Sequence, residues 1–300
     1  MIEPSPYRHA LDGLDIPDPV AAFFAWCIDR ETIRRKRAAG EPPPWTSDPV
    51  LRQGRFLNVF REDDPGTAAV LRFAEPVHGS LPNLIHALFF ARWCNRRGTL
   101  DALSPALLQD PAALRRALLH EVPQPWASDV YPVGPVTWDG RRHDRLAAGT
   151  DVLPAAVPFL EQAIRAARGD VIRAVAAVNN VFRMDNDFPV FMAVIDLAWF
   201  RPDLIRPDSP VPTGIGARPY LDRLQRHLKC ASHHETARRM IALQPRYWPE
   251  ARRPFQPIDI EYLSCELRKY FSYLNGTKTF DGRNRFTPAP GPAPFPFSGE

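Results

Sequence analysis

The sequence has few cysteines and no cysteine pair. Its 300 residues include four, which lie far apart and form no CxxC motif: Cys27, Cys94, Cys230 and Cys265. This spacing argues against a disulfide framework or a structural zinc site, and we expect reduced, buried, inert thiols. The pair His233-His234 does not change this, because adjacent histidines point to different sides of a helix and no further ligand completes a site. We therefore expect no cofactor; the sequence does not require a metal ion and does not exclude one.

Long apolar runs are also missing. No stretch of about 18 apolar residues occurs, so we expect no membrane-spanning helix. The first residues, MIEPSPYRHALDG, lack the charged-then-apolar layout of a signal peptide. A hydrophobic content of 45% is enough for a substantial core. The expectation is a folded cytoplasmic protein.

Several motifs of nucleotide-binding and hydrolytic enzymes are absent as well. The sequence contains no GxxxxGK[ST], no GxGxxG, no HExxH and no GxSxG. A P-loop kinase is therefore excluded.

Lysine is scarce, whereas arginine is abundant. Four of the 38 basic residues are lysines, which leaves 34 arginines. A GC-rich genome could explain this choice, but phosphate recognition explains it too, because guanidinium groups bind phosphate oxygens in pairs. Between Arg30 and Arg61 there are eight basic residues and three acidic ones, a local charge of +5 against +4 for the whole chain. Such a concentration of positive charge indicates a polyanionic partner.

The spacing of apolar residues predicts an all-α fold. Helices are expected at 19–39, from about 48 through Phe56, Val59 and Phe60 to Glu62, and at 66–75, 81–97, 99–120, 155–168, 170–182, 188–200 and 257–274. Strand signals are few. We predict one large helical domain over residues 1–287, with a loop insertion at 122–150 that could contain a short hairpin, and a loose proline-rich tail at 288–300.

The segment Arg30–Asp64 combines charges with aromatic anchors. It reads R-E-x-I-x-x-x-R-x-x-G-x-P-x-P-W-T-x-D-P-x-L-x-x-x-R-F-x-N-V-F-R-E-x-D. Intrahelical ion pairs on a solvated surface would explain the charges alone. Trp45, Phe56 and Phe60 lie between the charged positions, however, and they favour an ordered, partly enclosed wall.

This pattern resembles the α-glutamyl/putrescinyl-thymine pyrophosphorylases, also called amino acid:DNA transferases. It is also similar to the helical domain of 5-hydroxymethyldeoxyuridine DNA kinases. The resemblance continues at FMAVID (191–196), TGIGA (213–217) and IEYLSCELRKY (260–270), and it spans residues 20–276. It implies a late step in making bulky thymine bases: a kinase phosphorylates 5-hydroxymethyluracil in DNA, and the transferase then replaces the phosphate or pyrophosphate with an amino acid or polyamine. Without a P-loop, this chain is expected to perform the second step.

Such a substitution requires cations for the departing phosphate, a base for the attacking amine and a pocket for an extruded thymine. The predicted bases are Glu31, Glu62 and Asp196. The predicted phosphate and DNA contacts are Arg30, Arg34, Arg55, Arg61, Gly214, Gly216 and Arg218. The predicted pocket residues, which include two rings that could stack on the base, are Trp45, Asp48, Phe56 and Asn58.

Two further motifs have a structural alternative. The GIG turn could hold a phosphate on its backbone N–H groups, as in helix-hairpin-helix proteins, or it could be a plain turn. On the last helix Glu266, Lys269 and Tyr270 share a face and could orient the incoming amino acid, or form a surface ion pair. Cys265 could instead add to the uracil ring and assist elimination of the phosphate.

Two other functions compete with the transferase. One is a non-catalytic helical DNA-binding module that presents DNA to a base kinase. The other is a base-excision glycosylase, for which Asp222 would be the acid after the GIG turn. The transferase hypothesis expects the three predicted bases to converge on one pocket, whereas a binding module does not. The expected partners are DNA with phosphorylated 5-hydroxymethyluracil, a free amino acid or polyamine, and a DNA base kinase.

Overall fold

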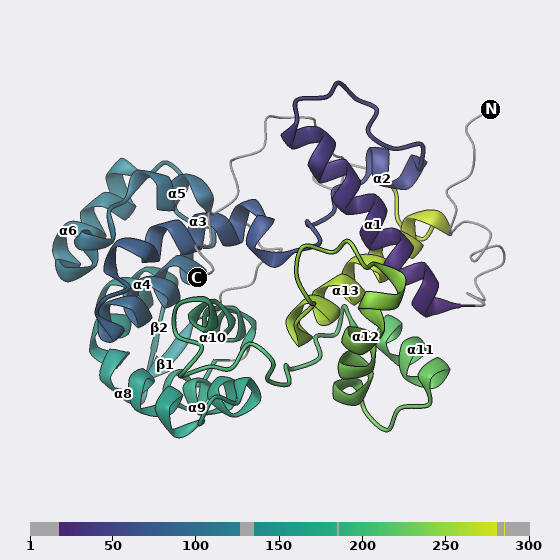
Figure 1. The fold of residues 1–300 in the computed structure, drawn as a ribbon. Coiled ribbons are helices and arrows are strands. Elements are labelled where there is room, and N and C mark those ends of the chain that lie inside the picture. Colours follow the sequence, from purple (N-terminus) through teal and green to yellow (C-terminus); the bar gives the residue numbers. More distant parts are fainter. Residues whose placement is uncertain (1–17, 127–134, 185, 281–284, 286–300) are drawn as a thin grey trace. The chain divides into compact units, whose positions relative to one another are not determined.

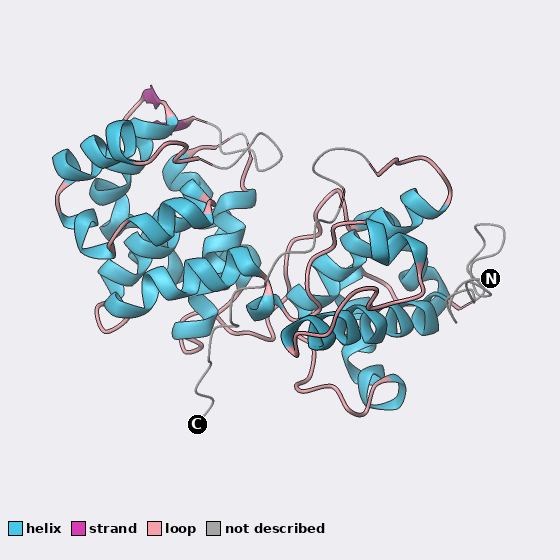
Figure 2. Cartoon of the chain, turned by 90° about the horizontal axis from the view of Figure 1, so that it is seen from above, coloured by secondary structure: helices cyan, strands magenta, loops and turns pink. Residues whose placement is uncertain are grey.

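The chain is mostly helical, as predicted. The computed structural model describes residues 18–126, 135–184, 186–280 and 285. In these ranges the only sheet is one antiparallel hairpin of strands β1 (Val136–Trp138) and β2 (Arg141–His143) (Figure 2). No helix within them is long and apolar enough to cross a membrane. The all-α fold class is therefore confirmed.

The chain divides into two compact units (Figure 1). Unit 1 consists of the described residues up to Asp64 and from Thr213 onward, and unit 2 consists of those from Pro65 to Pro212. The sequence analysis placed both in one domain of residues 1–287, and this extent stays a prediction. The predicted tail at 288–300 lies outside the described residues.

Unit 1 is built from helices of both chain segments. They are α1 (Pro19–Ala38), α2 (Pro49–Gln53), the 3₁₀ turn η1 (Arg61–Asp63), α11 (Arg218–Leu228), α12 (His233–Tyr247) and α13 (Pro257–Leu274). Helix α1 packs against α11, α12 and α13. Its core face carries Phe23 and Phe24, and the ring of Phe24 stacks on Tyr247 at 5.1 Å between centroids. This aromatic packing joins the N-terminal segment to the C-terminal helices.

Local signals explain where α1 begins and ends. The Asp18 carboxylate accepts hydrogen bonds from the backbone N–H groups of Val20 and Ala21 at 3.0 and 2.9 Å, which caps the first turn. Pro19 occupies the first helical position, where its missing N–H costs nothing. After the last turn, Gly40 has a φ of +74°, which turns the chain away from the helix.

The helix predicted to continue through Phe56 and Phe60 to Glu62 is not formed, and this prediction was wrong. Helix α2 ends at Gln53, and the chain then runs without regular structure to the short turn η1. A Cβ at Gly54 would come within 2.5 Å of the Phe56 ring, so only glycine fits this exit. Tertiary contacts override the helical spacing, because the backbone groups of this segment bond to side chains of α1 and α13 instead.

Unit 2 is a helical cluster around α4. Its main helices are α3 (Pro65–Ala74), α4 (Leu81–Cys94), α8 (Leu153–Ala166), α9 (Val171–Phe182) and α10 (Phe188–Phe200). Helix α4 packs against α3, α8 and α10 and is apolar around nearly its whole circumference. The segment 99–120, predicted as helical, contains the short helices α5 (Arg97–Ala102) and α6 (Pro111–Arg116), the 3₁₀ turn η3 (Pro105–Gln109) and the π-helical turn η4 (Ala117–Glu121). A further 3₁₀ turn, η2 (Glu75–Val77), follows α3.

The interval predicted as a loop insertion, residues 122–150, contains more structure than a loop. It includes the β1–β2 hairpin, the short helix α7 (Arg145–Ala147) and the start of the π-helical turn η5 (Ala148–Val152). Residues 127–134 of this interval lie outside the described residues.

A buried ion pair joins two helices of unit 2. The Arg92 guanidinium on α4 contacts the Asp196 carboxylate on α10 through Nε and, at 2.8 Å, through Nη2. Nη2 also donates to the Thr67 hydroxyl at 3.1 Å. The side chain of Arg92 is 3% exposed and that of Asp196 is fully buried. The carboxylate is therefore held by a full set of short contacts inside the helical core.

We predict that Asp196→Asn destabilises the protein by about 3–5 kcal/mol, because it leaves the Arg92 charge buried without a counter-charge. Chemical denaturation followed by circular dichroism measures this loss. The matched control is Asp203→Asn, which breaks the solvent-exposed Arg201–Asp203 pair of the same unit and should leave stability unchanged. Equal, small effects of the two substitutions would contradict the central role of the buried pair.

Candidate functional site

Unit 1 contains a pocket with a positively charged wall. Its volume is about 170 Å³, and it lies between α1, the connector that follows it, and α2. Three arginines contribute to the wall: Arg30, Arg37 and Arg52. The other lining residues are apolar, aromatic or small: Ile33, Pro43, Pro44, Trp45, Thr46, Leu51, Gly54 and Phe56. Among the residues that the structure describes, no aspartate or glutamate lines this pocket.

The connector wall is fixed by contacts to the basic end of α1. The Trp45 indole donates its Nε1–H to the Glu41 carbonyl at 2.7 Å. Lys36 Nζ donates to the Trp45 carbonyl at 3.4 Å, and the Arg37 guanidinium lies 5.5 Å from the centre of the Trp45 ring. These contacts hold an aromatic face beside positive charge, a combination that suits a planar anionic ligand.

The α2 wall depends on Asp48. Its Oδ1 accepts the N–H groups of Val50 and Leu51 at 2.9 and 2.7 Å, and its Oδ2 accepts the Tyr270 hydroxyl at 2.7 Å. Asp48 is 1% exposed, and it does not line the pocket. The predicted pocket residue Asp48 and the predicted amino-acid contact Tyr270 therefore bond to each other and anchor α2 to α13.

The wall at Phe56 is held by two other residues of α13. Glu266 Oε2 accepts the N–H of Leu57 at 2.9 Å, and Lys269 Nζ donates to the carbonyl of Arg55. The Lys269 ammonium also lies 4.9 Å from the centre of the Phe56 ring. Glu266 and Lys269, predicted to orient an amino acid, thus fix the backbone on both sides of Phe56 instead of lining the pocket.

Arg30 is the one predicted phosphate ligand that lines the pocket. It is 6% exposed, and its Nη2 donates to the Phe56 carbonyl at 3.1 Å and to Asn58 Oδ1 at 2.7 Å. Its buried Nη1 has no hydrogen-bond partner among the described residues. Burial, and to a smaller extent the nearby charge of Arg37, lower the pKa of Arg30 from 12.5 to about 10. A buried cation with an unused donor can accommodate an anion.

Asn58 links Arg30 to a network of ion pairs whose carboxylates are buried. Its Nδ2 donates to the Asp63 carbonyl at 2.6 Å, while its Oδ1 accepts from Arg30. The Asp63 carboxylate in turn contacts Arg34 Nε and Arg252 Nη1, each at 3.1 Å. Asn58 does not line the pocket itself; its amide holds the side chain of Arg30, which does.

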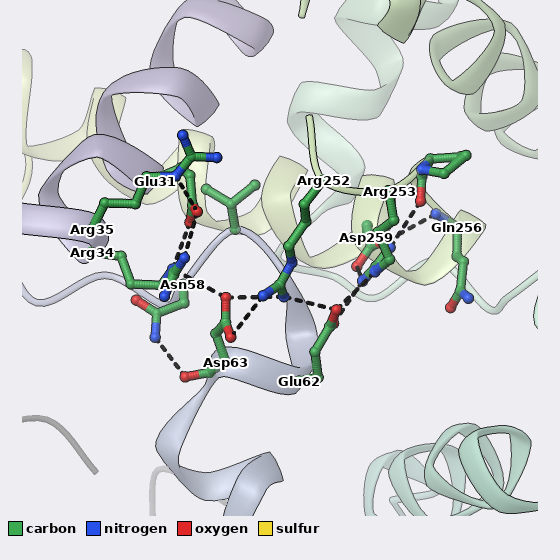
Figure 3. Close-up of polar contacts among 12 residues, drawn as sticks. Glu31, Arg34, Arg35, Asn58, Glu62, Asp63, Arg252, Arg253, Gln256 and Asp259 are labelled. Carbon is green, nitrogen blue, oxygen red and sulfur yellow. Dashed lines mark hydrogen bonds and ion pairs between the residues drawn. The ribbon is translucent and has the colours of Figure 1, made fainter. Parts of the chain in front are cut away.

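Figure 3 shows the network that contains the predicted bases Glu31 and Glu62. Glu31 accepts two hydrogen bonds from Arg34, at 2.7 and 2.6 Å, and one from Arg35 at 3.0 Å. Glu62 accepts one from Arg252 at 2.8 Å and two from Arg253, at 2.8 and 2.7 Å. Both carboxylates are fully engaged by arginines.

The same network continues to α13 and is balanced in charge. Arg253 Nη1 donates to Asp259 Oδ2 at 2.6 Å, and Asp259 also caps α13 by accepting the N–H of Gln256 at 2.8 Å (Figure 3). Four arginines face four carboxylates in it: Arg34, Arg35, Arg252 and Arg253, and Glu31, Glu62, Asp63 and Asp259. Burial works against the charged form of Glu62, but the hydrogen bonds from Arg253 and its charge outweigh burial and lower the pKa of Glu62.

The three predicted bases therefore do not converge on the pocket. Glu31 and Glu62 belong to the ion-pair network of unit 1, and Asp196 is paired with Arg92 inside unit 2. A carboxylate with a lowered pKa, such as Glu62, is also a weaker proton acceptor. The transferase hypothesis expected the three carboxylates to converge on one pocket, and they do not.

The other predicted phosphate arginines lie elsewhere in unit 1. Arg34 is engaged with Glu31 and Asp63, and Arg55 is exposed. Arg61 is 7% exposed, and its guanidinium lies 5.6 Å from the centre of the Tyr262 ring. Sequence reasoning counted Arg37 and Arg52 only as part of a charge excess, although they line the pocket. The sequence feature that could have indicated them is their position on either side of Trp45.

The GIG turn packs closely against α13. The Gly214 N–H donates to Glu261 Oε1 at 2.9 Å, so this predicted phosphate donor already has an acceptor. A Cβ at Gly216 would come within 2.5 Å of Cys265 Sγ, which explains the second glycine by close packing. Ile215 is 92% exposed at the tip, and Arg218 is exposed at the start of α11.

Two titratable residues beside this turn were not predicted as site residues. Burial raises the pKa of Glu261 from 4.5 to about 7, opposed by the hydrogen bond from Gly214. His233 lies within 2.7 Å of Asp222 Oδ1 and 3.2 Å of Thr213 Oγ1.

Within the described residues, no group of three His, Cys, Asp or Glu side chains is placed to hold a metal ion. Burial also raises the pKa of Cys265, which disfavours a reactive thiolate.

Comparison with known families supports one part of the resemblance. A family model described as 5-hmdU DNA kinase, helical domain, matches residues 18–110. This range is under a third of the chain, and it includes the whole pocket. No curated protein and no solved structure matches the chain. The similarity to the kinase helical domain is thus confirmed for this segment, and membership of the amino acid:DNA transferases stays a prediction.

We predict that Glu261 makes stability fall as the pH rises. Its pKa is higher in the folded protein than in the unfolded chain, so its contribution is complete below pH 4.5 and is lost as the pH approaches 7. Denaturation curves between pH 4.5 and 8 should show a loss of about 3 kcal/mol that Glu261→Gln does not show, since glutamine keeps an acceptor for Gly214 but does not ionise. The exposed Glu250→Gln should follow the wild type. Parallel curves for wild type and Glu261→Gln would contradict this assignment.

Proposed function

We propose that this chain acts in the hypermodification of thymine in DNA. In this proposal it binds phosphorylated 5-hydroxymethyluracil in the pocket of unit 1 and replaces the phosphate with an amino acid or polyamine. The match to the helical domain of a 5-hmdU DNA kinase supports the choice of substrate, because the matched residues form the pocket.

The observation that carries the proposal is the composition of the pocket wall. Arg30, Arg37 and Arg52 provide guanidinium groups that bind phosphate oxygens through charge-assisted hydrogen bonds. Trp45 and Phe56 provide aromatic surface for a pyrimidine ring. A base inside a duplex cannot reach such a pocket, so it is extruded from the helix or presented in a single strand.

The proposed reaction occurs at the 5-methylene carbon of the base. A neutral amine forms a C–N bond to this carbon while the C–O bond to the phosphate breaks, and the electron pair of that bond leaves with the phosphate. The arginines stabilise the charge that builds up on the departing group. The group expelled from a dianionic monoester formally carries three negative charges, so it takes up the proton that the amine loses and departs as hydrogen phosphate. This route requires no carboxylate in the pocket wall.

A second candidate function is a non-catalytic module that binds modified DNA for a separate base kinase. The observation that favours it is the engagement of Glu31 and Glu62 by arginines, together with the place of Asp196 in unit 2. A module needs the pocket and its arginines, but it needs no proton acceptor.

We predict that DNA with phosphorylated 5-hydroxymethyluracil gains the mass of an amine when it is incubated with the protein and a pool of amino acids and polyamines. Mass spectrometry of the digested nucleosides detects the product. DNA with unphosphorylated 5-hydroxymethyluracil should not react. Arg30→Lys should slow the reaction by about 10-fold or more, because lysine loses the paired hydrogen bonds of the guanidinium.

The same samples separate the two functions. Selective binding of phosphorylated DNA without any adduct would support the module and exclude the transferase. If the protein neither binds the phosphorylated DNA nor forms an adduct on it, both functions are overturned.

A further inference from the structure

The pocket is positively charged, whereas the ion-pair network is neutral, and this difference restricts the charge of the ligand that the pocket can bind. The network pairs four arginines with four carboxylates, so its acids are used within it. The pocket wall has three arginines and, among the described residues, no acid. We infer that this pocket selects a terminal phosphate with two negative charges, a phosphomonoester, over the singly charged phosphodiester of a DNA backbone. The inference rests on the proposed function for the organic part of the ligand.

Arg30 supplies the first argument for a dianion. Its Nη2 is used by Phe56 and Asn58, and its Nη1 is buried without a hydrogen-bond partner in the described part of the chain. Its pKa is lowered first by burial and then by Arg37. An anion in the pocket would reverse both effects, and a dianion would do so more strongly than a monoanion.

The nearby carboxylates do not supply this compensation. Glu266, Glu31 and Asp64 raise the pKa of Arg30 through their charges, but burial outweighs them and none of them lines the pocket. Glu266 accepts from the Leu57 N–H and lies 3.5 Å from Lys269, and Glu31 is held by Arg34 and Arg35. On the pocket side, Arg30 therefore keeps a buried Nη1 that has no hydrogen-bond partner in the described part of the chain.

The placement of the other two arginines fits a terminal phosphate. Arg37 on α1 and Arg52 on α2 approach the pocket from different elements, and Arg52 is solvent-exposed. A phosphomonoester offers three terminal oxygens to Arg30 Nη1 and the guanidinium groups of Arg37 and Arg52, whereas a diester offers two and leaves its flanking sugars to be accommodated in a pocket of about 170 Å³. The cost of placing three cations around one cavity is offset best by the more highly charged group.

The test compares two small probes with the full-length protein by isothermal titration calorimetry. One probe is the nucleoside 5-phosphomethyl-deoxyuridine, a monoester, and the other is the dinucleotide TpT, a diester. At pH 7.5 the monoester should bind at least about tenfold more tightly. This preference should shrink as the pH falls to 5, because the monoester gains a proton near about pH 6, whereas the diester keeps its charge.

Matched variants locate the preference. Arg37→Gln and Arg52→Gln should each reduce it about fivefold or more, because each removes one charge from the wall. Arg35→Gln is the control: Arg35 is on the same helix as Arg37, pairs with Glu31 and does not line the pocket. It should keep the wild-type preference. Circular dichroism shows that each variant is folded, and Arg37→Lys and Arg52→Lys, which keep the charge, should recover part of the preference.

Two results would overturn the inference. Equal affinity for the two probes would show that the pocket does not distinguish phosphate charge. An equal loss in Arg35→Gln and Arg37→Gln would assign the effect to general surface charge. The proposed function fails separately: a monoester preference without any amine adduct on DNA leaves the inference standing, and an adduct with equal probe affinities overturns the inference alone.

Discussion

Between Gly54 and Phe60 the chain leaves α2 and runs without regular structure, and its backbone groups bond to side chains of α1 and α13. Arg30 bonds to the carbonyl of Phe56, Glu266 accepts the N–H of Leu57, and Tyr262 donates to the carbonyls of Asn58 and Val59. Buried backbone groups must find partners, so these side chains determine the path of the segment. The Phe56 ring, the orientation of Arg30 and the entry to the ion-pair network all depend on that path.

This constraint explains which parts of the fold could be predicted. The helices whose limits depend on local signals were found, such as α1 with the Asp18 cap and α13 from Pro257 to Leu274. The segment after Gln53 has the apolar spacing of a helix, yet it is not one. Its partners on α13 lie more than 200 residues away, and nothing in the local sequence indicates them.

The same reasoning applies to the site residues. Arg30 was predicted to contact phosphate, and Trp45 and Phe56 to form a pocket; all three line the pocket of unit 1, and their roles stay predictions. The predicted roles of Glu31 and Glu62 depended on free carboxylates. Their arginine partners on the same helix could have been suspected from a spacing of three and four residues, but Arg252 and Arg253 could not, because they come from the other chain segment of unit 1. Asp196 was predicted as a base, but its buried partner Arg92 became visible only in the structure.

The acidic side chains and the arginines of the segment Arg30–Asp64 therefore have different roles. A buried carboxylate that is paired with arginines stabilises the fold and loses its strength as a base, which is what happens to Glu62. If the same carboxylates lay in the pocket wall, they would neutralise Arg30 and Arg37 and repel a phosphate. The acids lie instead in a charge-balanced network that includes Glu31, the residue after Arg30, and Asn58 connects Arg30 to the backbone carbonyl of Asp63 in that network. The same segment thus stabilises the fold and places arginines but, among the described residues, no acids in the wall of the pocket. In the reaction that we propose, the substrate brings its own proton acceptor, because the departing phosphate takes up the proton that the amine loses.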